Sequence, residues 1–427
     1  MPQSDVRPAG DGRPLITDPF ASRWLERPGH VTVVEPRLPD GFRAATRAAG
    51  IKPSGRPDLA LLVCDSEHAV SALRQTRSSA AAAPVLLNRE QCVAEAISGA
   101  LINSGNANAG TGEQGYADAI ALRGAAAEAL GLDPSHIAVF STGIIGKRLD
   151  PAPLFDPITT LAGELTHESA ADVATAIVTT DRAPKLLTAE VELDGGTVLV
   201  SAQAKGAGMI SPSFATMLCF IQTDALISPE TASLLLGATV RRSFERISVD
   251  GQLSTNDAVL LMASGSSGVE VLAESADELR LGEALDAILR SLALEIVADG
   301  EGAARVGRVI VEGGDDEIVE HVAREVAGSP LVKAALHGGD PNWGRVLGAV
   351  GMALPDRPRM PIDIEIEGTL VCSAGEAVEH DEKDLAESVS GVEVEYLIRL
   401  PGSGSACEVF FSDLSHEYVT INSEYTT

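Results

Sequence analysis

A single threonine stands where a loop changes into a buried strand. Residues 205–225 read KGAGMISPSFATMLCFIQTDA, in which the glycines and proline favour a loop and the apolar run 215–221 favours a strand. Thr216 lies at the entry to that run. A threonine hydroxyl is a weak nucleophile, but cutting the chain just before it frees an α-amine that can serve as its general base. Such an amine has a pKa of about 7.7 to 8.0, so part of it is unprotonated near neutral pH. Thr216 is therefore a candidate nucleophile; the plainer alternative is a β-branched residue that fills a strand.

A second chemical feature follows the predicted strand at residues 137–140. The chain continues as STGIIGK, so a Thr142–Gly143 pair stands at the strand end. Such a pair can direct a hydroxyl and a backbone N–H to one point, which is what stabilising an oxyanion requires. Taken alone, the segment is more typical of a strand-to-loop turn.

Six further polar segments are each ambiguous in isolation, because clusters of Asn, Gly, Ser and Asp usually form turns. His337 begins one of them and is interpreted as a structural histidine beside a turn rather than as an acid–base group. The segments are NSGNANAGTGEQG at 103–115, TTDRAPK at 179–185, STND at 254–257, DGEG at 299–302, HGGDPNWGR at 337–345 and the terminal INSEYTT at 421–427.

Together these motifs resemble one family. The pattern K-G-A-G-M-I-x-P-x-x-A-T-M-L-x-x-x-x-T-D-A is similar to the self-cleavage segment of the glutamate N-acetyltransferase family, also called the ornithine acetyltransferase family. The other motifs occur in the order found in that family, and the resemblance covers residues 31–427. In that family the bond before the threonine is cut autocatalytically, which here is the Ala215–Thr216 bond.

The resemblance implies a set of functional residues and a reaction. The acetyl group of N2-acetyl-ornithine would pass to Thr216 and then to the α-amine of glutamate, a ping-pong step of arginine biosynthesis, with Thr142 and Gly143 as the oxyanion hole. Glu301 would hold an ammonium group. The implied substrate-binding residues are Thr179, Lys205, Thr216, Glu301, Asn422 and Thr427. The family needs no metal or other cofactor, although some members accept acetyl-CoA as a second donor.

Several departures from the family pattern leave alternatives open. Gly110 stands where the family often has Cys, residues 73–76 replace an F-T-x-N pattern, and Gln252 and Leu253 replace a more polar pair. Residues 1–30 resemble nothing in the family. One alternative is a paralogue in specialised metabolism that acetylates another amino acid or amine. Another is a self-cleaving hydrolase of the aminopeptidase type, in which water takes the acyl group.

Composition excludes several classes of partner. The 427 residues carry a net charge of -29, which disfavours binding to nucleic acid or to an anionic membrane surface. The five cysteines are scattered and contain no C-x-x-C pair, so we expect neither a disulfide framework nor a zinc site. No apolar run is long enough to span a membrane, and the first residues lack the order of a signal peptide. We therefore expect a cytoplasmic enzyme whose partners are small molecules.

The expected fold is α/β: a layered α/β sandwich of the ornithine acetyltransferase type with a smaller C-terminal α/β region. Aromatic residues make up only 4% of the chain, so Ala, Val, Leu and Ile must build the core. Residues 1–30 are expected to be disordered or loosely docked, with a possible short helix around Trp24. Residues 31–215 and 216–427 would be the α and β chains of an (αβ)2 heterotetramer. Patterning predicts strands at 59–63, 100–102, 137–140, 189–202 (two strands), 361–366 and 408–411, and helices at 116–130, 169–178, 229–244, 281–298 and 318–336.

Overall fold

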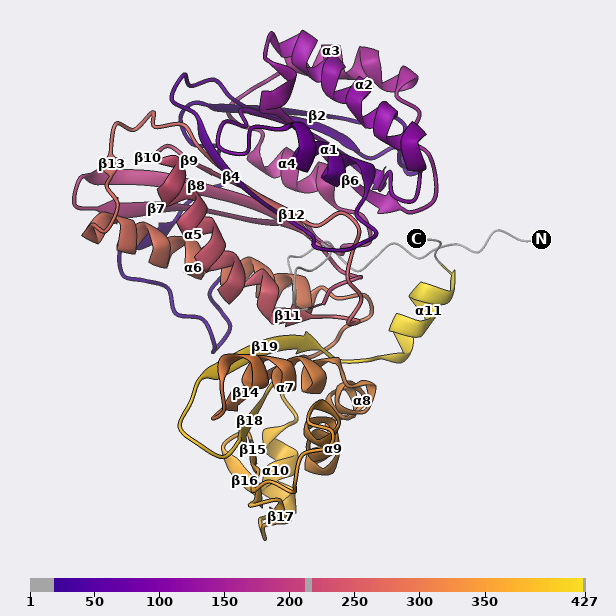
Figure 1. Ribbon diagram of the computed structural model, residues 1–427, viewed down its shortest axis with the longest axis vertical. Helices are drawn as coiled ribbons and strands as arrows, with labels where there is room; N and C mark the ends of the chain where they lie inside the picture. The colour runs from indigo at the N-terminus through magenta and orange to yellow at the C-terminus, as the bar shows by residue number, and fades with distance from the viewer. Residues whose placement is uncertain (1–18, 212–216, 425–427) are drawn as a thin grey trace.

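Two stacked sheets form the centre of the larger part of the molecule. A computed structural model describes residues 19–211 and 217–424, and Figure 1 shows the sheets lying between two layers of helices. The six-stranded sheet has the order β1 (Val31–Val33), β7 (Lys185–Leu193), β8 (Gly196–Lys205), β9 (Leu218–Thr223), β12 (Ala258–Ala263), β4 (Val70–Gln75). The four-stranded sheet has the order β2 (Phe42–Arg47), β3 (Leu59–Cys64), β5 (Gly99–Asn106), β6 (Ile137–Ile144).

Helices cover both outer faces of this pair of sheets. One layer, on the four-stranded sheet, contains α1 (Ala83–Gln91), α2 (Gly112–Leu130) and α3 (Phe155–Gly163). The other layer, on the six-stranded sheet, contains α5 (Pro229–Arg242) and α6 (Ala276–Ala298). A shorter helix, α4 (Ala170–Ile177), contacts strands of both sheets. A two-stranded sheet, β10 (Leu226–Ile227) with β13 (Glu270–Val271), lies beside them. The layered α/β prediction is confirmed.

Strand β9 is buried on both of its faces, which explains its unbroken apolar sequence. Successive side chains of a strand point to opposite faces. Cys219 and Ile221 accordingly pack toward α5 and α6, whereas Leu218 and Phe220 pack toward the four-stranded sheet. The rings of Phe220 and Phe140 meet edge to face with centroids 5.1 Å apart. The strand therefore lies at the centre of the molecule and fixes the segment that follows residue 216.

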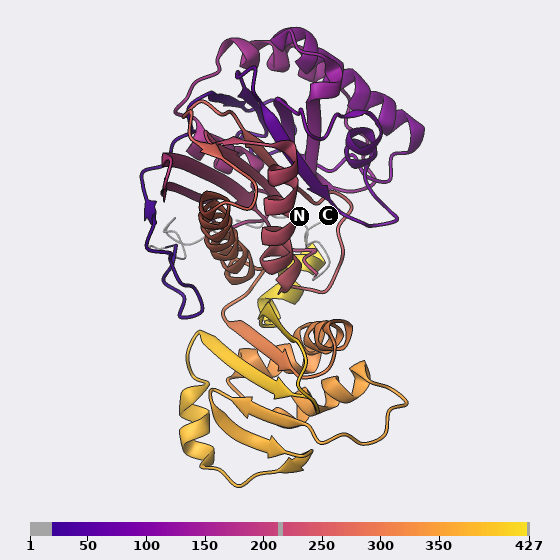
Figure 2. The same cartoon turned by 60° about the vertical axis from the view of Figure 1, so that its left-hand side comes forward.

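The C-terminal region is a smaller α/β unit built on a seven-stranded sheet, seen at the bottom of Figure 1. Its strand order is β11 (Ile247–Ser248), β19 (Ala406–Ser412), β14 (Val306–Glu312), β18 (Glu393–Arg399), β15 (Asp363–Ile366), β16 (Thr369–Ser373), β17 (Glu376–Ala377). Its helices are α7 (Asp316–Gly328), α8 (Pro330–Gly338), α9 (Trp343–Ala353) and α10 (Glu382–Ser388). After β19 the chain forms α11 (His416–Glu424), which Figure 2 shows between this unit and the sandwich. The predicted smaller C-terminal region is thus present.

Sequence patterning placed most elements within a few residues but joined two helices into one. The prediction of a single helix at 318–336 is wrong, because α7 ends at Gly328 and α8 begins at Pro330. Ser329 accepts a hydrogen bond from the backbone N–H of Val332, so it caps the second helix, and proline is favoured in a first helical turn. A Ser–Pro pair inside an amphipathic stretch is a start signal that periodicity overlooks.

Residues 19–30 dock on the molecule through turns and not through the short helix expected around Trp24. The Trp24 ring lies 5.7 Å from that of Phe410 on β19, and Arg23 forms a two-pronged ion pair with Glu367 at 2.5 and 2.8 Å. The carbonyl of Pro19 accepts a hydrogen bond from Ser291 on α6. This segment therefore connects the sandwich with the C-terminal region. Residues 1–18 lie outside the described residues.

None of the helices in residues 19–211 and 217–424 is both long enough and apolar enough to cross a membrane.

Replacing Trp24 by alanine tests this connection. Removal of a fully buried tryptophan costs about 3 to 5 kcal/mol, and because Trp24 is only partly buried we expect a loss of about 2 kcal/mol in the free energy of unfolding. Urea denaturation measures it. The control is Leu272→Ala, whose side chain is 59% exposed and whose removal should change stability by less than about 0.5 kcal/mol. Equal stabilities for Trp24→Ala and the wild type would contradict a structural contribution of this segment.

Candidate active site

A cavity of about 290 Å³ opens where the sandwich, the C-terminal region and α11 come together. Its walls come from the end of β6, the segment after α4, the end of β8 and the loops after β8, β11 and α6. The lining residues are Thr142, Gly143, Thr179, Thr180, Lys205, Gly208, Met209, Asp250, Gln252, Glu301, Tyr418 and Asn422. Segments that are far apart in the sequence thus meet at one small polar hollow, of a size suited to an amino-acid derivative.

One wall of the cavity is a backbone arrangement that only glycine permits. Strands β5 and β6 run parallel, and Gly105 lies beside Gly143 near the end of their pairing, just before a register irregularity at Asn106. Gly143 has a φ of +131°, and a Cβ added there would lie 2.3 Å from the carbonyl carbon of Gly105. The two backbones approach closely here because Gly143 carries no side chain. Gly143 can therefore present its backbone to the cavity next to the hydroxyl of Thr142.

Lys205 ends β8 with its ammonium group inside the protein, only 3% exposed. Its Nζ donates hydrogen bonds to the hydroxyls of Thr179, at 2.7 Å, and Thr142, at 3.3 Å. Because the oxygen of Thr142 accepts from Lys205, its own hydrogen is free to point into the cavity. The ammonium group thus orients a hydroxyl donor and places a positive charge beside it.

A buried network of charges holds Lys205 in place. Asp181 lies 3.8 Å from its Nζ, accepts from Lys185 at 2.8 Å and accepts from the backbone N–H of Gly206 at 2.7 Å. Lys185 also donates to Asp299 at 2.6 Å. Burial alone would raise the pKa of Asp181, but the two lysines outweigh it and hold that pKa well below its usual range. For Lys205 burial dominates and lowers the pKa, with Asp181 acting in the opposite direction.

The loop after β8 is held by a second carboxylate. Asp250 accepts hydrogen bonds from the backbone N–H groups of Met209, at 2.6 Å, Ile210, at 2.9 Å, and Gln252, at 3.0 Å. Met209 has a φ of +53°, a left-handed conformation that a side-chain-bearing residue rarely adopts. Such backbones persist where the surroundings impose them, and they concentrate at functional sites.

Another wall of the cavity joins Glu301 to α11. The backbone N–H of Glu301 donates to Ala207 at 2.9 Å, and its Oε2 accepts from Nδ2 of Asn422 at 2.9 Å. A Cβ on Gly302, whose φ is +69°, would lie 2.4 Å from the backbone nitrogen of Tyr418. The glycine therefore lets α11 pack against this loop and bring Tyr418 and Asn422 to the cavity.

The structure brings together most of the residues that the sequence nominated. Thr142, Gly143, Thr179, Lys205, Glu301 and Asn422 all line this one cavity. Their individual functions remain predictions. Ala215, Thr216 and Thr427 lie outside the described residues, and so does the predicted cleavage site. The neighbouring Met217 is described, and its backbone N–H donates to the buried carboxylate of Asp257 at 3.0 Å.

Six lining residues were not among the predicted site residues. Thr180 follows a nominated threonine, and Gly208 and Met209 belong to the motif before residue 216, so proximity in sequence could have found them. Gln252 was noted only as a departure from the family pattern. Asp250 and Tyr418 gave no signal, because their places depend on how β11 and α11 pack. His337 does not line the cavity; its Nδ1 lies 2.7 Å from Oδ2 of Asp413.

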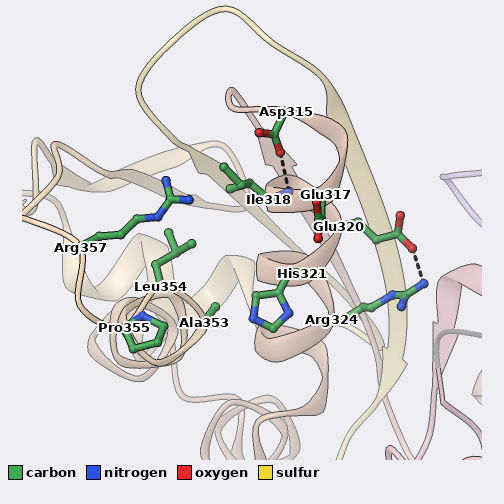
Figure 3. Close-up of a pocket in the computed structure, with 10 residues that line it drawn as sticks. All are labelled: Asp315, Glu317, Ile318, Glu320, His321, Arg324, Ala353, Leu354, Pro355 and Arg357. Atoms are coloured by element: carbon green, nitrogen blue, oxygen red, sulfur yellow. Dashed lines mark hydrogen bonds and ion pairs between the residues drawn. The ribbon is translucent and has the colours of Figure 1, made fainter.

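A second hollow, in the C-terminal region, is larger but lacks comparable chemistry. It measures about 620 Å³ and lies between α7 and the end of α9, as Figure 3 shows. Its charged side chains, including His321 and Arg357, are mostly exposed and of both signs, and Asp315 is used to cap α7. It contains none of the residues that the motifs nominated. The smaller cavity is therefore the candidate active site.

Within the described ranges, no group of three or more His, Cys, Asp or Glu side chains is placed to hold a metal ion.

The chain is similar to known proteins over most of its length. The profile of the ArgJ family matches residues 43–427. The Arginine biosynthesis bifunctional protein ArgJ of Synechocystis is 38% identical over 416 residues, covering 95% of this chain and 99% of the relative. That of Nitratidesulfovibrio vulgaris is 40% identical over 390 residues, covering 91% and 98%. A crystal structure of the Bacillus halodurans protein of that name is 32% identical and covers 48% of this chain and 98% of that chain, with a TM-score of 0.46.

The family match spans nine-tenths of the chain. This chain belongs to the ArgJ family, and the resemblance seen in its motifs is confirmed.

The charge network predicts a pH-dependent stability. Asp181→Asn leaves two buried ammonium groups without their shared partner, so we expect a loss of about 3 kcal/mol in the free energy of unfolding at pH 7. Because the folded-state pKa of Asp181 is below the unfolded value of about 3.9, its contribution is complete well above pH 4 and declines as the pH falls below that value. The difference between variant and wild type should therefore shrink in acid.

Urea denaturation at several pH values measures both effects. The matched control is Asp65→Asn, since Asp65 forms a half-exposed ion pair with Arg43 and should contribute less than about 1 kcal/mol. A variant as stable as the control at pH 7 would contradict the account of Asp181.

Proposed function

We propose that this protein is an acetyltransferase of arginine biosynthesis that moves an acetyl group from N2-acetyl-ornithine to glutamate. The main support comes from two observations taken together. Relatives named as arginine biosynthesis proteins match at 38 to 40% identity over nearly their whole length. The predicted oxyanion pair and substrate-binding residues of the described part converge on one cavity.

The proposed nucleophile is Thr216, freed by cleavage of the Ala215–Thr216 bond. Lys205, which lines the cavity, and Leu218 are partners in the pairing of β8 with β9. Thr216 is two residues before Leu218. This position in the sequence supports the proposal that the Thr216 hydroxyl acts together with Thr142 and Gly143. These two residues lie on β6, which pairs with β5.

In the proposed first half-reaction the Thr216 hydroxyl attacks the acetyl carbonyl of the donor. Its proton passes to the α-amine of Thr216, and the carbonyl oxygen becomes an oxyanion. The Thr142 hydroxyl and the Gly143 N–H would donate hydrogen bonds to that oxygen; in comparable sites one donor is worth about 3 to 4 kcal/mol. Collapse of the intermediate breaks the bond to the ornithine α-amine, which leaves with the proton and leaves an acetyl ester on Thr216.

Binding of the amino-acid portion follows from the charges of the cavity. Lys205 and Thr179 lie beside the proposed oxyanion hole and suit an α-carboxylate, whose carbon is two bonds from the acylated nitrogen. Glu301 lines the same cavity, where it suits the distal ammonium of ornithine. The terminal Thr427 is proposed to complete this part of the cavity, since α11 already brings Asn422 to it.

The proposed second half-reaction reverses the first with another amine. Glutamate enters the same cavity, its α-amine attacks the acetyl ester, and Thr216 is released. Neither half requires a metal ion or another cofactor. Acetyl-CoA is proposed as a possible second donor, in accord with the word bifunctional in the names of the relatives.

We propose further that the two fragments stay together as an αβ unit and pair into (αβ)2. Strand β9 is hydrogen-bonded to β8 on one side and to β12 on the other, while β12 also pairs with β4. Both fragments would therefore share one sheet. A cytoplasmic location is proposed because all five cysteines are free thiols.

The function is tested with purified protein, N2-acetyl-ornithine and glutamate. We expect glutamate-dependent formation of ornithine and N-acetyl-glutamate. Release of free acetate without an acceptor would instead indicate a hydrolase. An acceptor panel in which glutamate performs poorly would indicate a paralogue with a different substrate.

Thr216→Ala should remain a single chain of 44.2 kDa and lose transferase activity, because both steps use the hydroxyl. The intact mass and the transfer assay measure the two effects separately. Thr159→Ala, on the exposed side of α3, is the matched control and should be cut and active. A cut Thr216→Ala protein would remove Thr216 from the proposal.

Glu301→Gln should impair use of acetyl-ornithine by about tenfold or more in kcat/KM, because a neutral amide cannot pair with the distal ammonium. The comparison is with a donor that lacks this ammonium, such as N-acetyl-norvaline, whose use should fall less. Glu417→Gln, exposed on α11, is the control. If both donors lose the same factor, Glu301 does not recognise the distal charge.

A further inference from the structure

The proposed reaction places opposite charges at one end of the same cavity. The donor side chain ends in an ammonium group and the acceptor side chain in a carboxylate, although both bind through the same α-carboxylate. A site built for one charge repels the other. The inference below rests on the proposed function and asks which residues meet the anionic end.

The described part of the wall around Glu301 offers no positively charged side chain that could bind an anion. Among the described lining residues the only cation is Lys205, which is already engaged by Thr142, Thr179 and Asp181. The lining also contains two carboxylates, Asp250 and Glu301. An acceptor carboxylate there must therefore be bound by neutral hydrogen-bond donors.

Neutral donors on this wall differ in whether they are already used. Both N–H bonds of the Asn422 amide are engaged, one with Glu301 at 2.9 Å and the other with the carbonyl of Tyr418 at 3.0 Å. The Gln252 amide makes only a marginal 3.4 Å contact with the carbonyl of Leu253. Its side chain is exposed to the cavity, so this amide is available for a ligand.

Tyr418 supplies a second available donor. Its hydroxyl has no hydrogen bond to any of the residues that the structure describes, although the ring lines the cavity. Burial raises the pKa of Tyr418 to about 12, so the hydroxyl keeps its proton throughout the working range. The backbone N–H of Tyr418 is fixed by Ser415 at 3.1 Å, which anchors the start of α11.

We propose that the Gln252 amide and the Tyr418 hydroxyl form a neutral donor pair that binds the side-chain carboxylate of the acceptor amino acid. Glu301 binds the ammonium of the donor on the same wall. Because Gln252 and Tyr418 carry no charge, they bind an anion without repelling the cationic donor, and the amide oxygen of Gln252 can accept from that donor. The pair thus determines which acceptors the enzyme uses.

The test compares glutamate with glutamine as acceptors, since the two have nearly the same shape and differ in the charge at the distal end. The measured quantity is the ratio of their kcat/KM values, using full-length protein and acetyl-ornithine as donor. In Gln252→Glu a second carboxylate faces the acceptor, so we expect the ratio to fall by about tenfold or more. Tyr418→Phe and Gln252→Leu each remove one donor and should lower the ratio by about threefold to tenfold.

Gln114→Glu on the exposed side of α2 is the matched control and should keep the wild-type ratio. Because the readout is a ratio within one variant, partial loss of folded protein does not change it. A ratio within twofold of wild type in both Gln252→Glu and Tyr418→Phe would overturn the proposal.

Failure of the proposed function is distinguishable from failure of this inference. Mass spectrometry of the wild-type protein after addition of acetyl-ornithine should show one acetyl group on the fragment that begins at Thr216. If that acetylated fragment does not form, the proposed function is overturned and this inference with it. If it forms and the ratios do not change, only the donor pair is overturned.

Discussion

A positive charge buried at the end of β8 is the constraint on which the rest of the site depends. An ammonium group inside a protein is stable only when it is paired and hydrogen-bonded. Lys205 meets this requirement through Asp181, Thr179 and Thr142, and Asp181 in turn is shared with Lys185. The arrangement fixes the segment after α4, the start of the loop after β8 and the end of β6 relative to one another. The contacts that compensate the buried charge of Lys205 are therefore the same contacts that fix the geometry of the candidate active site.

The charge network also reaches the junction between the sandwich and the C-terminal region. Lys185 reaches Asp299 at the end of α6, and Glu301 two residues later faces Asn422 on α11. The walls of the cavity consequently come from segments that lie far apart in the sequence, and no single motif supplies them all. Docking of residues 19–30 on α6 and β19 holds the same two parts together from another side.

Sequence reasoning went furthest where local chemistry dictates structure. The unbroken apolar run of β9, the loop before it and the glycine of the Thr142–Gly143 pair all follow from short-range rules, and the family motifs located the nominated lining residues. It failed where a signal was weak or non-local. The break between α7 and α8 depends on one Ser–Pro pair, and α2 begins at Gly112, inside the segment expected to be a turn. Asp250 and Tyr418 enter the cavity only through the packing of β11 and α11, which no local pattern encodes.

The position of β9 affects how the protein would fold before and after the proposed cut. Its hydrogen bonds to β8 form within one continuous chain, where the two strands are tethered by a short loop and closure costs little entropy. Once the proposed cut is made, the same pairing between separate fragments would depend on their concentration. The chain would then fold efficiently only before cleavage. The lifetime of the folded, cleaved enzyme would depend on a slow rate of unfolding, because refolding from separated fragments would be inefficient.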